Sequence, residues 1–368
     1  MLQEVLKRVE GQLSQGLPFV IYRKPNDKEV KAILQKDDTV YHTHDFSEQG
    51  FVIAPFQGDH PPILLPLHEQ LTAHSSQEKT SLGRALDIDG GSAQEKEGHL
   101  RLVKQGIREI ANGKFDKVVL SRKLEVRCTK PPLQILMRLL ATYESAFCYL
   151  WYHPKVGMWM GATPEILLRT SNQSLTTMSL AGTQTVVEDE RPIWGHKELE
   201  EQQMVTDYIR ETLQGKVSHL KQSEVASIRA GNLWHLRTKI TAGYNKNLSE
   251  IIQALHPTPA VCGMPLEPAR DFILENENYK REFYTGFLGE LNLKQEIHRT
   301  KSERNQENKS YRAIKTTSEL FVNLRCMKFS DTKATLYVGG GITKVSDPAK
   351  EWQETVAKSK TMLQVITD

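Results

Sequence analysis

Several features are scarce in this chain of 368 residues, and each scarcity excludes a class of protein. Only four cysteines occur, and no two of them have the close spacing of a zinc site or of a small disulfide-stapled fold. We therefore expect reduced cysteines, most of them in the core of an intracellular protein. They are Cys128, Cys148, Cys262 and Cys326.

Long apolar runs are missing as well. No stretch approaches the roughly 20 apolar residues that span a bilayer. The N-terminal sequence MLQEVLKRVEGQL also lacks the uninterrupted apolar segment of a signal peptide. These absences predict a cytoplasmic protein without a membrane partner.

Neither sign of charge is in large excess, because 48 Lys and Arg residues face 45 Asp and Glu residues for a net charge of +3. No basic cluster is interleaved with aromatic residues, so we expect no nucleic-acid partner. A P-loop is also missing, which makes a nucleotide an unexpected ligand. With 39% hydrophobic residues, the chain still has enough apolar side chains for a large core.

What the sequence does contain is a succession of strand and helix patterns. Residues 1 to about 95 predict strands and turns, with FVIYR and FVIAPF as strands, and the polar stretch from 74 to 97 predicts a mobile connection. Apolar residues at helical spacing then follow from His99 until Asn112 and Gly113 end the helix. KVVLSRKLEV is expected to be a strand, LQILMRLLATY a helix, and FCYLWYHP with VGMWMGA a pair of strands.

The second half of the chain continues this alternation. LLRTSNQSLTTMSLAGT predicts a hairpin, residues 196–213 a long helix, and FYTGFLGELNL a strand, with a final helix after SDP. The charged segment 294–315 is expected to be a solvated hairpin or loop that tolerates shortening. Long strands of antiparallel type with segregated helices predict an α+β fold rather than a doubly wound parallel sheet.

An acidic pair lies on the predicted helix KELEEQQMVTDYI. Helical spacing places Glu198 and Glu201 on the stripe of Val205 and Ile209, and it places Lys197 outside that stripe. Two glutamates at this spacing usually face solvent. On an apolar stripe they need a cation or hydrogen-bond donors, because an unpaired buried carboxylate is costly.

A second acidic pair follows the strand TLYVGGG. Asp347 and the proline after it begin a helix, on which Glu351 and Glu354 share one face with Lys358. The three glycines before this helix allow close approach of a ligand to the backbone. Two carboxylate pairs without His or Cys partners suit a hard, oxygen-seeking cation, for which Mg²⁺ is the natural candidate.

From about residue 96 onward the chain resembles the chorismate-utilising enzymes, which include the isochorismate, salicylate, anthranilate and aminodeoxychorismate synthases. The matching segments are FDKVVLSR, MGATPEILL, LAGT, KELEEQQMV, HPTPAVCGMP, REFYTGFLGEL, and YVGGGI with SDPAKEWQET. They occur in the family's order, whereas residues 1–95 match only loosely. The resemblance implies one domain over residues 1–368, with 96–368 as the catalytic core. It also implies two stacked antiparallel sheets flanked by helices, with the active site in a cleft between them.

The resemblance also implies residue roles. It makes Glu201 and Glu354 ligands of Mg²⁺, with Glu198 and Glu351 behind them. Eight further positions match substrate-contacting residues, including an Arg fork suited to a carboxylate; these are Gly182, Thr183, His235, Ala260, Tyr284, Arg325, Gly340 and Lys358. Without the resemblance, His235 and Tyr284 would be interpreted as ordinary core residues.

Two residues of the matched segments are expected to carry the chemistry. Lys117 corresponds to the lysine of family members that use water as the nucleophile, and Glu165 corresponds to their general acid. A lysine must be neutral to accept a proton, and burial near a cation favours that form. A glutamate in apolar surroundings can keep its proton near neutral pH. Together they would add water at C2 of chorismate while the C4 hydroxyl departs.

Ala260 distinguishes the branches, because members that go on to eliminate pyruvate tend to have threonine there. We therefore expect release of isochorismate, with a salicylate synthase and a non-catalytic chorismate-binding paralogue as alternatives. Many isochorismate synthases have histidine where this chain has Gln202, and we expect Mg²⁺ binding to be kept. HPTPAV favours menaquinone over siderophore biosynthesis. No glutaminase partner is expected, and the chain is expected to be a monomer or a weak homodimer.

Overall fold

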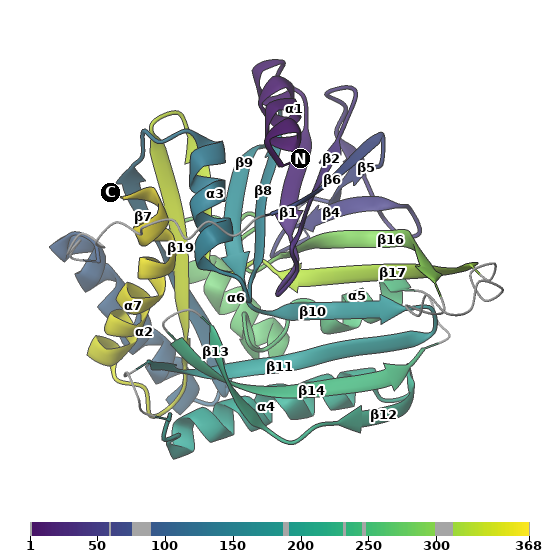
Figure 1. Cartoon of the computed structure of the whole chain (residues 1–368). Helices are drawn as coiled ribbons and strands as arrows, with labels where there is room; N and C mark the ends of the chain where they lie inside the picture. The colour runs from purple at the N-terminus through teal and green to yellow at the C-terminus, as the bar shows by residue number, and fades with distance from the viewer. Residues whose placement is uncertain are drawn as a thin grey trace.

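Two large antiparallel sheets form the framework of the protein, as a computed structural model shows (Figure 1). The structure describes residues 2–58, 60–75, 90–186, 191–230, 233–244, 248–298 and 312–367. All of the strand pairings within these residues are antiparallel. This arrangement confirms the predicted fold class.

The first sheet has nine strands, eight of which come from the two ends of the described chain and from residues 117–163. In spatial order they are β15 (Gly263–Met264), β7 (Lys117–Arg127), β19 (Lys333–Ile342), β18 (Cys326–Ser330), β9 (Gly157–Thr163), β8 (Phe147–His153), β1 (Phe19–Arg23), β2 (Glu29–Leu34) and β6 (Glu69–His74).

The second sheet has ten strands, nine of them on one path and the tenth, β13 (Ala226–Ala230), paired to β14 beside that path. Along the path the spatial order is β12 (Ser218–Gln222), β14 (Leu233–Gly243), β11 (Ser174–Thr185), β10 (Ile166–Ser171), β17 (Arg312–Val322), β16 (Phe287–His298), β4 (Gly50–Ala54), β5 (Ile63–Pro66) and β3 (Tyr41–His42).

Helices cover the outer faces of both sheets (Figure 1). On the first sheet, α1 (Leu2–Ser14) packs on β1, β2 and β6, α3 (Pro132–Thr142) on β8 and β9, and α2 (Ala93–Ala111) and α7 (Pro348–Ile366) on β19. On the second sheet, α4 (His196–Leu213) packs on β11 and β14 and contacts α5 (Leu248–Leu255). The remaining helix, α6 (Leu266–Asn276), packs on β7 and β15.

An aromatic core joins the two sheets. The rings of Phe147 on β8 and Phe321 on β17 stack with their centroids 4.3 Å apart, and Tyr22 on β1 contacts Phe51 on β4 at 5.2 Å. All four side chains are fully buried or nearly so. Burial of such large apolar surfaces stabilises the face-to-face contact of the sheets. This contact fixes the spacing of the strand ends that form the cavity described below.

Many sequence predictions hold at the level of elements. The helix predicted at 196–213 is α4, the predicted hairpin is β10 and β11 with Ser171 opposite Ser174, and Asp347 caps α7 through Lys350 N. The strands FVIYR and FVIAPF correspond to β1 and β4. All four cysteines are buried and free, as expected.

Two predictions need correction. Residues 2–14 form a helix, α1, rather than strands and turns, because Val5 and Val9 pack on the first sheet. The helix expected from His99 begins at Ala93, where Ser92 and Glu95 form a capping box within the stretch interpreted as a connection. The segment 294–315, predicted to be a hairpin or a loop, is a hairpin in its described parts, since β16 and β17 stay paired as far as His298 and Arg312. Residues 299–311 lie outside the described part of the chain.

Among the described residues, no helix is both long enough and apolar enough to cross a membrane.

A buried ion pair fixes α6 and the turn after it against the first sheet. Arg281 donates to both carboxylate oxygens of Glu277, from Nη2 at 2.6 Å and from Nε at 2.8 Å. Its Nη1 donates to the carbonyl of Val261, and Nη2 also donates to the carbonyl of Val119. Both charged side chains are more than 90% buried. Val119 and Val261 also line the cavity between the sheets that is described in the next subsection. The Arg281–Glu277 ion pair therefore supports the wall of that cavity.

We expect Arg281→Met to lower the free energy of unfolding by about 3–5 kcal/mol, because it leaves the Glu277 carboxylate buried without a cation. Urea unfolding followed by circular dichroism measures the change. Lys328→Met is the matched control, since its ion pair with Glu282 is largely exposed and is expected to contribute about 0–1 kcal/mol. An equal loss for the two variants would contradict the prediction.

Candidate active site

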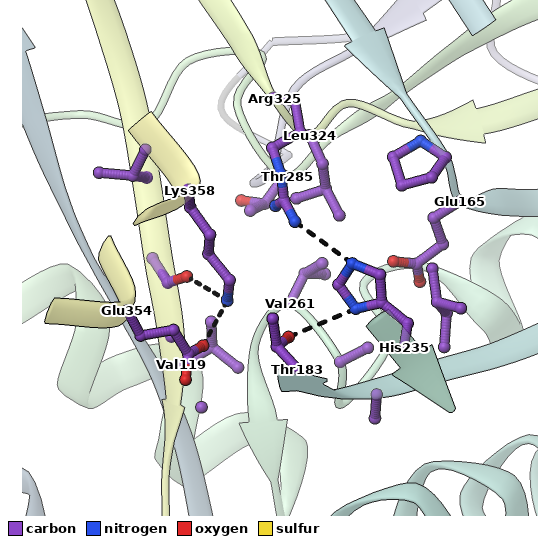
Figure 2. Close-up of a pocket in the computed structure, with 18 of the residues that line it drawn as sticks. Val119, Glu165, Thr183, His235, Val261, Thr285, Leu324, Arg325, Glu354 and Lys358 are labelled. Carbon is purple, nitrogen blue, oxygen red and sulfur yellow. Dashed lines mark hydrogen bonds and ion pairs between the residues drawn. The ribbon is translucent and has the colours of Figure 1, made fainter. Parts of the chain in front are cut away.

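A cavity between the two sheets brings together most of the residues that the sequence singled out. Strands β7 and β19 of the first sheet, strands β11 and β14 of the second, and helix α7 contribute to its wall. The predicted residues that line it are Glu165, Gly182, Thr183, Glu201, His235, Ala260, Tyr284, Arg325, Gly340, Glu354 and Lys358. Figure 2 shows Glu354 and Lys358 on one side of this cavity and Glu165 and His235 on the other.

Two glycines of β19 allow carboxylates to reach the strand's backbone. A methyl group on Gly340 would lie 3.4 Å from Glu351 Oε2 and 3.4 Å from Glu354 Oε1, and one on Gly341 would lie 2.5 Å from Glu201 Oε1. The contact at Gly341 is too close for any side chain while Glu201 stays in place, whereas that at Gly340 is an ordinary van der Waals distance. Oxygens from α4 and α7 therefore converge on two neighbouring residues of one strand.

Each of these carboxylates has a lysine partner. Lys117 Nζ lies 2.7 Å from Glu201 Oε1, Lys197 Nζ lies 2.6 Å from Glu351 Oε1, and Lys358 Nζ lies 2.6 Å from Glu354 Oε1. As they are arranged here, no three His, Cys, Asp or Glu side chains of the described residues are grouped closely enough to hold a metal ion. The lysine ammonium groups thus compensate the carboxylate charge within the protein.

The first acidic pair differs from the sequence interpretation in two respects. The buried stripe of α4 is formed by Gln202, Val205 and Ile209 among others, so Glu201 lies at its edge. The Glu198 carboxylate accepts from Gly195 N at 3.0 Å and caps the start of the helix, away from the other carboxylates. Lys197, which was predicted to lie outside the apolar stripe, reaches across to Glu351 on α7.

Burial and ion pairing give Glu201 the properties of a charged group. Burial alone would raise the pKa of its carboxyl. The ion pair with Lys117, assisted by the charges of Lys197 and Lys358, outweighs burial and holds this pKa below its ordinary value. Glu201 is therefore ionised at neutral pH.

The carboxyl of Glu165, in contrast, has a raised pKa. It lies between β9 and β10, its side chain is 4% exposed, and burial raises the pKa of its carboxyl to about 8. Lys117, Arg325 and Lys358 act in the opposite direction without overcoming burial. Glu165 therefore carries a proton at neutral pH, as the sequence analysis expected of a general acid.

His235 and Arg325 are linked at the cavity wall (Figure 2). His235 Nδ1 lies 3.1 Å from the carbonyl oxygen of Gly182, and its Nε2 lies 3.5 Å from Arg325 Nη2. Burial, together with the charge of Arg325, lowers the pKa of His235 to about 3, so the ring is neutral. Since a carbonyl only accepts, Nδ1 carries the proton and Nε2 is free to accept from the guanidinium.

Gly182 permits this link because it lies in a bulge of β11. The register with β14 shifts between Ala181 and Thr183, and Gly182 has a φ of +69°. A side chain at that φ is strained, and the space is closed by Glu198 Cβ, 3.2 Å from the position of a methyl group. The bulge points the Gly182 carbonyl to His235.

Arg325 and Lys358 supply positive charge that faces the cavity. Among the described residues, Arg325 forms no ion pair within 4 Å, whereas Lys358 also donates to the carbonyl of Gly339 at 2.9 Å. A buried guanidinium without a carboxylate partner is costly unless an anion binds it. The cavity is therefore suited to an anionic ligand.

Tyr284 closes the floor of the cavity near Gly339. Its side chain is 3% exposed, and its ring stacks on that of Tyr337 with centroids 5.5 Å apart.

The sequence analysis missed several residues of this site. Lys197 was the largest omission, because its partner lies 154 residues away and no local pattern reveals it. Tyr337 and Val119 could have been found by strand alternation, since they share a face with Gly339 and Lys117 respectively. Lys117 itself is fully buried behind the cavity wall, where it pairs with Glu201 and lies against Gly341.

Gln202 has a structural explanation. Its carboxamide oxygen accepts from Ala181 N at 2.9 Å, and its nitrogen donates to Ser179 Oγ at 2.8 Å and to Thr238 Oγ1 at 3.1 Å. These contacts attach α4 to β11 and β14. The side chain points away from the carboxylate group, as expected from its helical position.

Comparison with known proteins identifies related chains. The family described as chorismate binding enzyme matches residues 63–297 and 311–367. Isochorismate synthase MenF of Escherichia coli (strain K12) is 31% identical over 285 residues, which cover 74% of this chain and 61% of that protein. Isochorismate synthase EntC of the same strain is 29% identical over 327 residues, covering 83% of this chain and 78% of that protein.

Solved structures show the same fold. The menaquinone-specific isochorismate synthase MenF from Escherichia coli superposes with a TM-score of 0.74 at 23% identity, covering 95% of this chain and 89% of that chain. Anthranilate synthase component I from Streptococcus pneumoniae TIGR4 superposes with a TM-score of 0.64 at 19% identity, covering 94% and 90%. At these identities the likeness establishes the fold alone.

The raised pKa of Glu165 predicts a pH-dependent contribution to stability. Between about pH 4.5 and pH 8 the folded protein holds a proton that the unfolded chain releases, so the free energy of unfolding falls as pH rises through this window. We expect Glu165→Gln to remove this fall and to be the more stable protein at pH 9, by on the order of a few kcal/mol.

Urea unfolding of the wild type and the variant at pH 5 and pH 9 measures this difference. The exposed Glu224→Gln is the control, for which we expect no change in pH dependence. Parallel pH dependence of the wild type and Glu165→Gln would show that Glu165 is ionised throughout.

Proposed function

The chain belongs to the family of chorismate-binding enzymes, and we propose that it converts chorismate into isochorismate. The observation that carries this proposal is the cavity in which a buried, protonated Glu165 lies across from Arg325 and Lys358, with the ionised Glu201 and the carboxyl group of Glu354 in the same wall. The names of MenF and EntC support the same activity. In enzyme-class terms the proposed reaction is an isomerisation.

Chorismate is a dianion, and Arg325 and Lys358 provide the charges to hold it. The Arg325 guanidinium is oriented by the neutral His235. It has no anionic partner within ion-pair distance among the described residues. A planar fork of this kind binds a carboxylate with two parallel hydrogen bonds. Thr183, Gly182 and Tyr284 line the same space and shape it around the ring.

We propose that Mg²⁺ binds at Gly340 and Gly341, with Glu201 and Glu354 as ligands. The fit rests on the donors: the oxygens of Glu201, Glu351 and Glu354 reach these two residues, and Glu351 Oε2 is buried without a hydrogen-bond partner. Carboxylate oxygens are the ligands that Mg²⁺ prefers. When bound, the ion would neutralise and orient a substrate carboxylate. Glu198 contributes to the site through the cap of α4, not as a ligand.

Acid and base functions are divided between Glu165 and Lys117. Glu165 gives its proton to the departing C4 hydroxyl, which leaves as water, and its raised pKa keeps that proton available at neutral pH. Lys117 accepts a proton from the water that attacks C2. For this step Lys117 must be neutral, so its ammonium group first loses a proton to solvent and its ion pair with Glu201 breaks. Binding of the Glu201 carboxylate to another cation would break that ion pair.

The proposed product is isochorismate rather than salicylate, because Ala260 offers no hydroxyl to the ring. We also propose that the product feeds menaquinone biosynthesis, on the strength of HPTPAV and the similarity to MenF, although EntC is nearly as similar. Growth of a menaquinone-deficient bacterial strain lacking its own isochorismate synthase would test the pathway. The lysine-paired carboxyl groups, Glu165 and Lys117 together favour an enzyme over a non-catalytic binding protein.

We expect turnover of chorismate to isochorismate to require Mg²⁺ and to be abolished by Glu201→Gln or Glu354→Gln. Product chromatography after incubation with chorismate, with and without a chelator, measures this requirement. Both variants should keep the fold by circular dichroism, with a lower free energy of unfolding, because each loses an ion pair with Lys117 or Lys358. The exposed Glu200→Gln is the control. Full turnover after exhaustive chelation would exclude the metal site.

We expect Ala260→Thr to raise the ratio of salicylate to isochorismate several-fold, because a hydroxyl beside the ring can hold isochorismate in the conformer that eliminates pyruvate. A barrier change of about 1 kcal/mol is sufficient for such a shift. Salicylate fluorescence in the product mixture gives the ratio. Ala260→Val, which has the shape of threonine without its hydroxyl, is the control. Salicylate as the main product of the wild type would overturn the proposed branch.

A further inference from the structure

Lys197 joins the two helices that carry the acidic group. It lies in the first turn of α4, and its Nζ is 2.6 Å from Glu351 Oε1 on α7. The Lys197 side chain is 26% exposed, whereas that of Glu351 is 2% exposed. Neither the family positions matched above nor the proposed chemistry gives this lysine a role.

The charge of Lys197 responds to the whole acidic group and not only to its nearest partner. Burial alone would lower the pKa of its ammonium group, but the charges of Glu351, Glu354 and Glu201 reverse this and raise the pKa. In turn, Lys197 is among the charges that lower the pKa of Glu201. One ammonium group therefore lies in the field of three carboxylates from two helices.

The acidic group and its lysines balance in formal charge, although burial raises the pKa of the Glu351 carboxyl. Three carboxylates are matched by three ammonium groups at 2.6–2.7 Å; the six residues are Glu201, Glu351, Glu354, Lys117, Lys197 and Lys358. Lys117 and Lys358 have proposed roles toward water and substrate. Lys197 is the member with no role except compensation of charge.

We propose that Lys197 is an internal counter-cation that competes with Mg²⁺ for the carboxylates at Gly340 and Gly341. The proposal rests on the proposed Mg²⁺ site. A divalent cation that approaches a group already neutralised by lysines gains less than one that approaches bare carboxylates. Lys197 therefore keeps the affinity for Mg²⁺ low until a dianionic substrate is present, and it stabilises the protein without the metal.

The sign of the effect separates this role from a merely structural one. If Lys197 competes with Mg²⁺, its removal leaves one negative charge in excess and tightens Mg²⁺ binding. If Lys197 only holds Glu351 in place, its removal disorders that carboxylate and weakens Mg²⁺ binding or leaves it unchanged. Stability without metal falls in both cases, so the affinity for Mg²⁺ is the measurement that decides.

Isothermal titration of MgCl₂ into the metal-free protein, without chorismate, is the test. We expect Lys197→Met to bind Mg²⁺ about tenfold more tightly than the wild type, as removal of one charge within a few ångström of a divalent ion implies. Lys197→Arg, which keeps the charge, should restore the affinity of the wild type. Lys350→Met removes an exposed charge beside Glu351 and should change the affinity no more than about twofold.

Thermal unfolding gives a second readout. Without Mg²⁺, Lys197→Met should unfold at a lower temperature than the wild type, and saturating Mg²⁺ should raise its Tm by more than it raises that of the wild type. If Lys197→Met does not fold, Lys197→Gln replaces it, because its amide keeps a polar contact with Glu351 without the charge.

The outcomes distinguish this inference from the proposed function. Turnover that depends on Mg²⁺, combined with equal or weaker Mg²⁺ binding by Lys197→Met, would overturn the role of Lys197 alone. Turnover that persists after chelation would overturn the metal site and this inference with it. Tighter binding by Lys197→Met that Lys197→Arg reverses is the result that supports it.

Discussion

The pairing of three carboxylates with three ammonium groups beside Gly340 and Gly341 is the interaction on which the rest of the cavity depends. Glutamates placed this close together without compensation would repel one another, and an unpaired charge in a protected site is costly. The ammonium groups come from β7, α4 and α7. Because α4 packs on the second sheet and β7 and α7 belong to the first, the pairs Lys117–Glu201 and Lys197–Glu351 also hold the two layers together at the cavity.

Two glutamates of this cavity, Glu201 and Glu165, differ in protonation because of this arrangement. Glu201 has a lysine 2.7 Å away and is ionised, whereas Glu165 has no ion-pair partner among the described residues and keeps its proton to about pH 8. His235 is neutral because it is buried near Arg325. An acid, an ionised oxygen group and an oriented cation thus coexist in one cavity, and the surroundings of each group decide its charge.

Local patterns in the sequence predicted much of the fold. The helix 196–213, the hairpin at Ser171 and the cap at Asp347 depend on residues within a few positions of one another, so that periodicity and capping chemistry identify them. The helix Leu2–Ser14 was missed because only two of its residues are buried, which leaves a weak pattern. The extent of β16 and β17 was missed because ladder pairing in a charged segment has no hydrophobic signal.

The sequence by itself determined which residue types stand at the matched family positions, and most of those positions do line one cavity. Only the tertiary structure decided how they are paired and charged. Lys197 and Glu351 are 154 residues apart, and the protonation of Glu165 depends on burial created by both sheets. Spacing along a chain specifies neighbours on the same helix or strand, whereas a pKa or an ion pair depends on distances between elements that only folding sets.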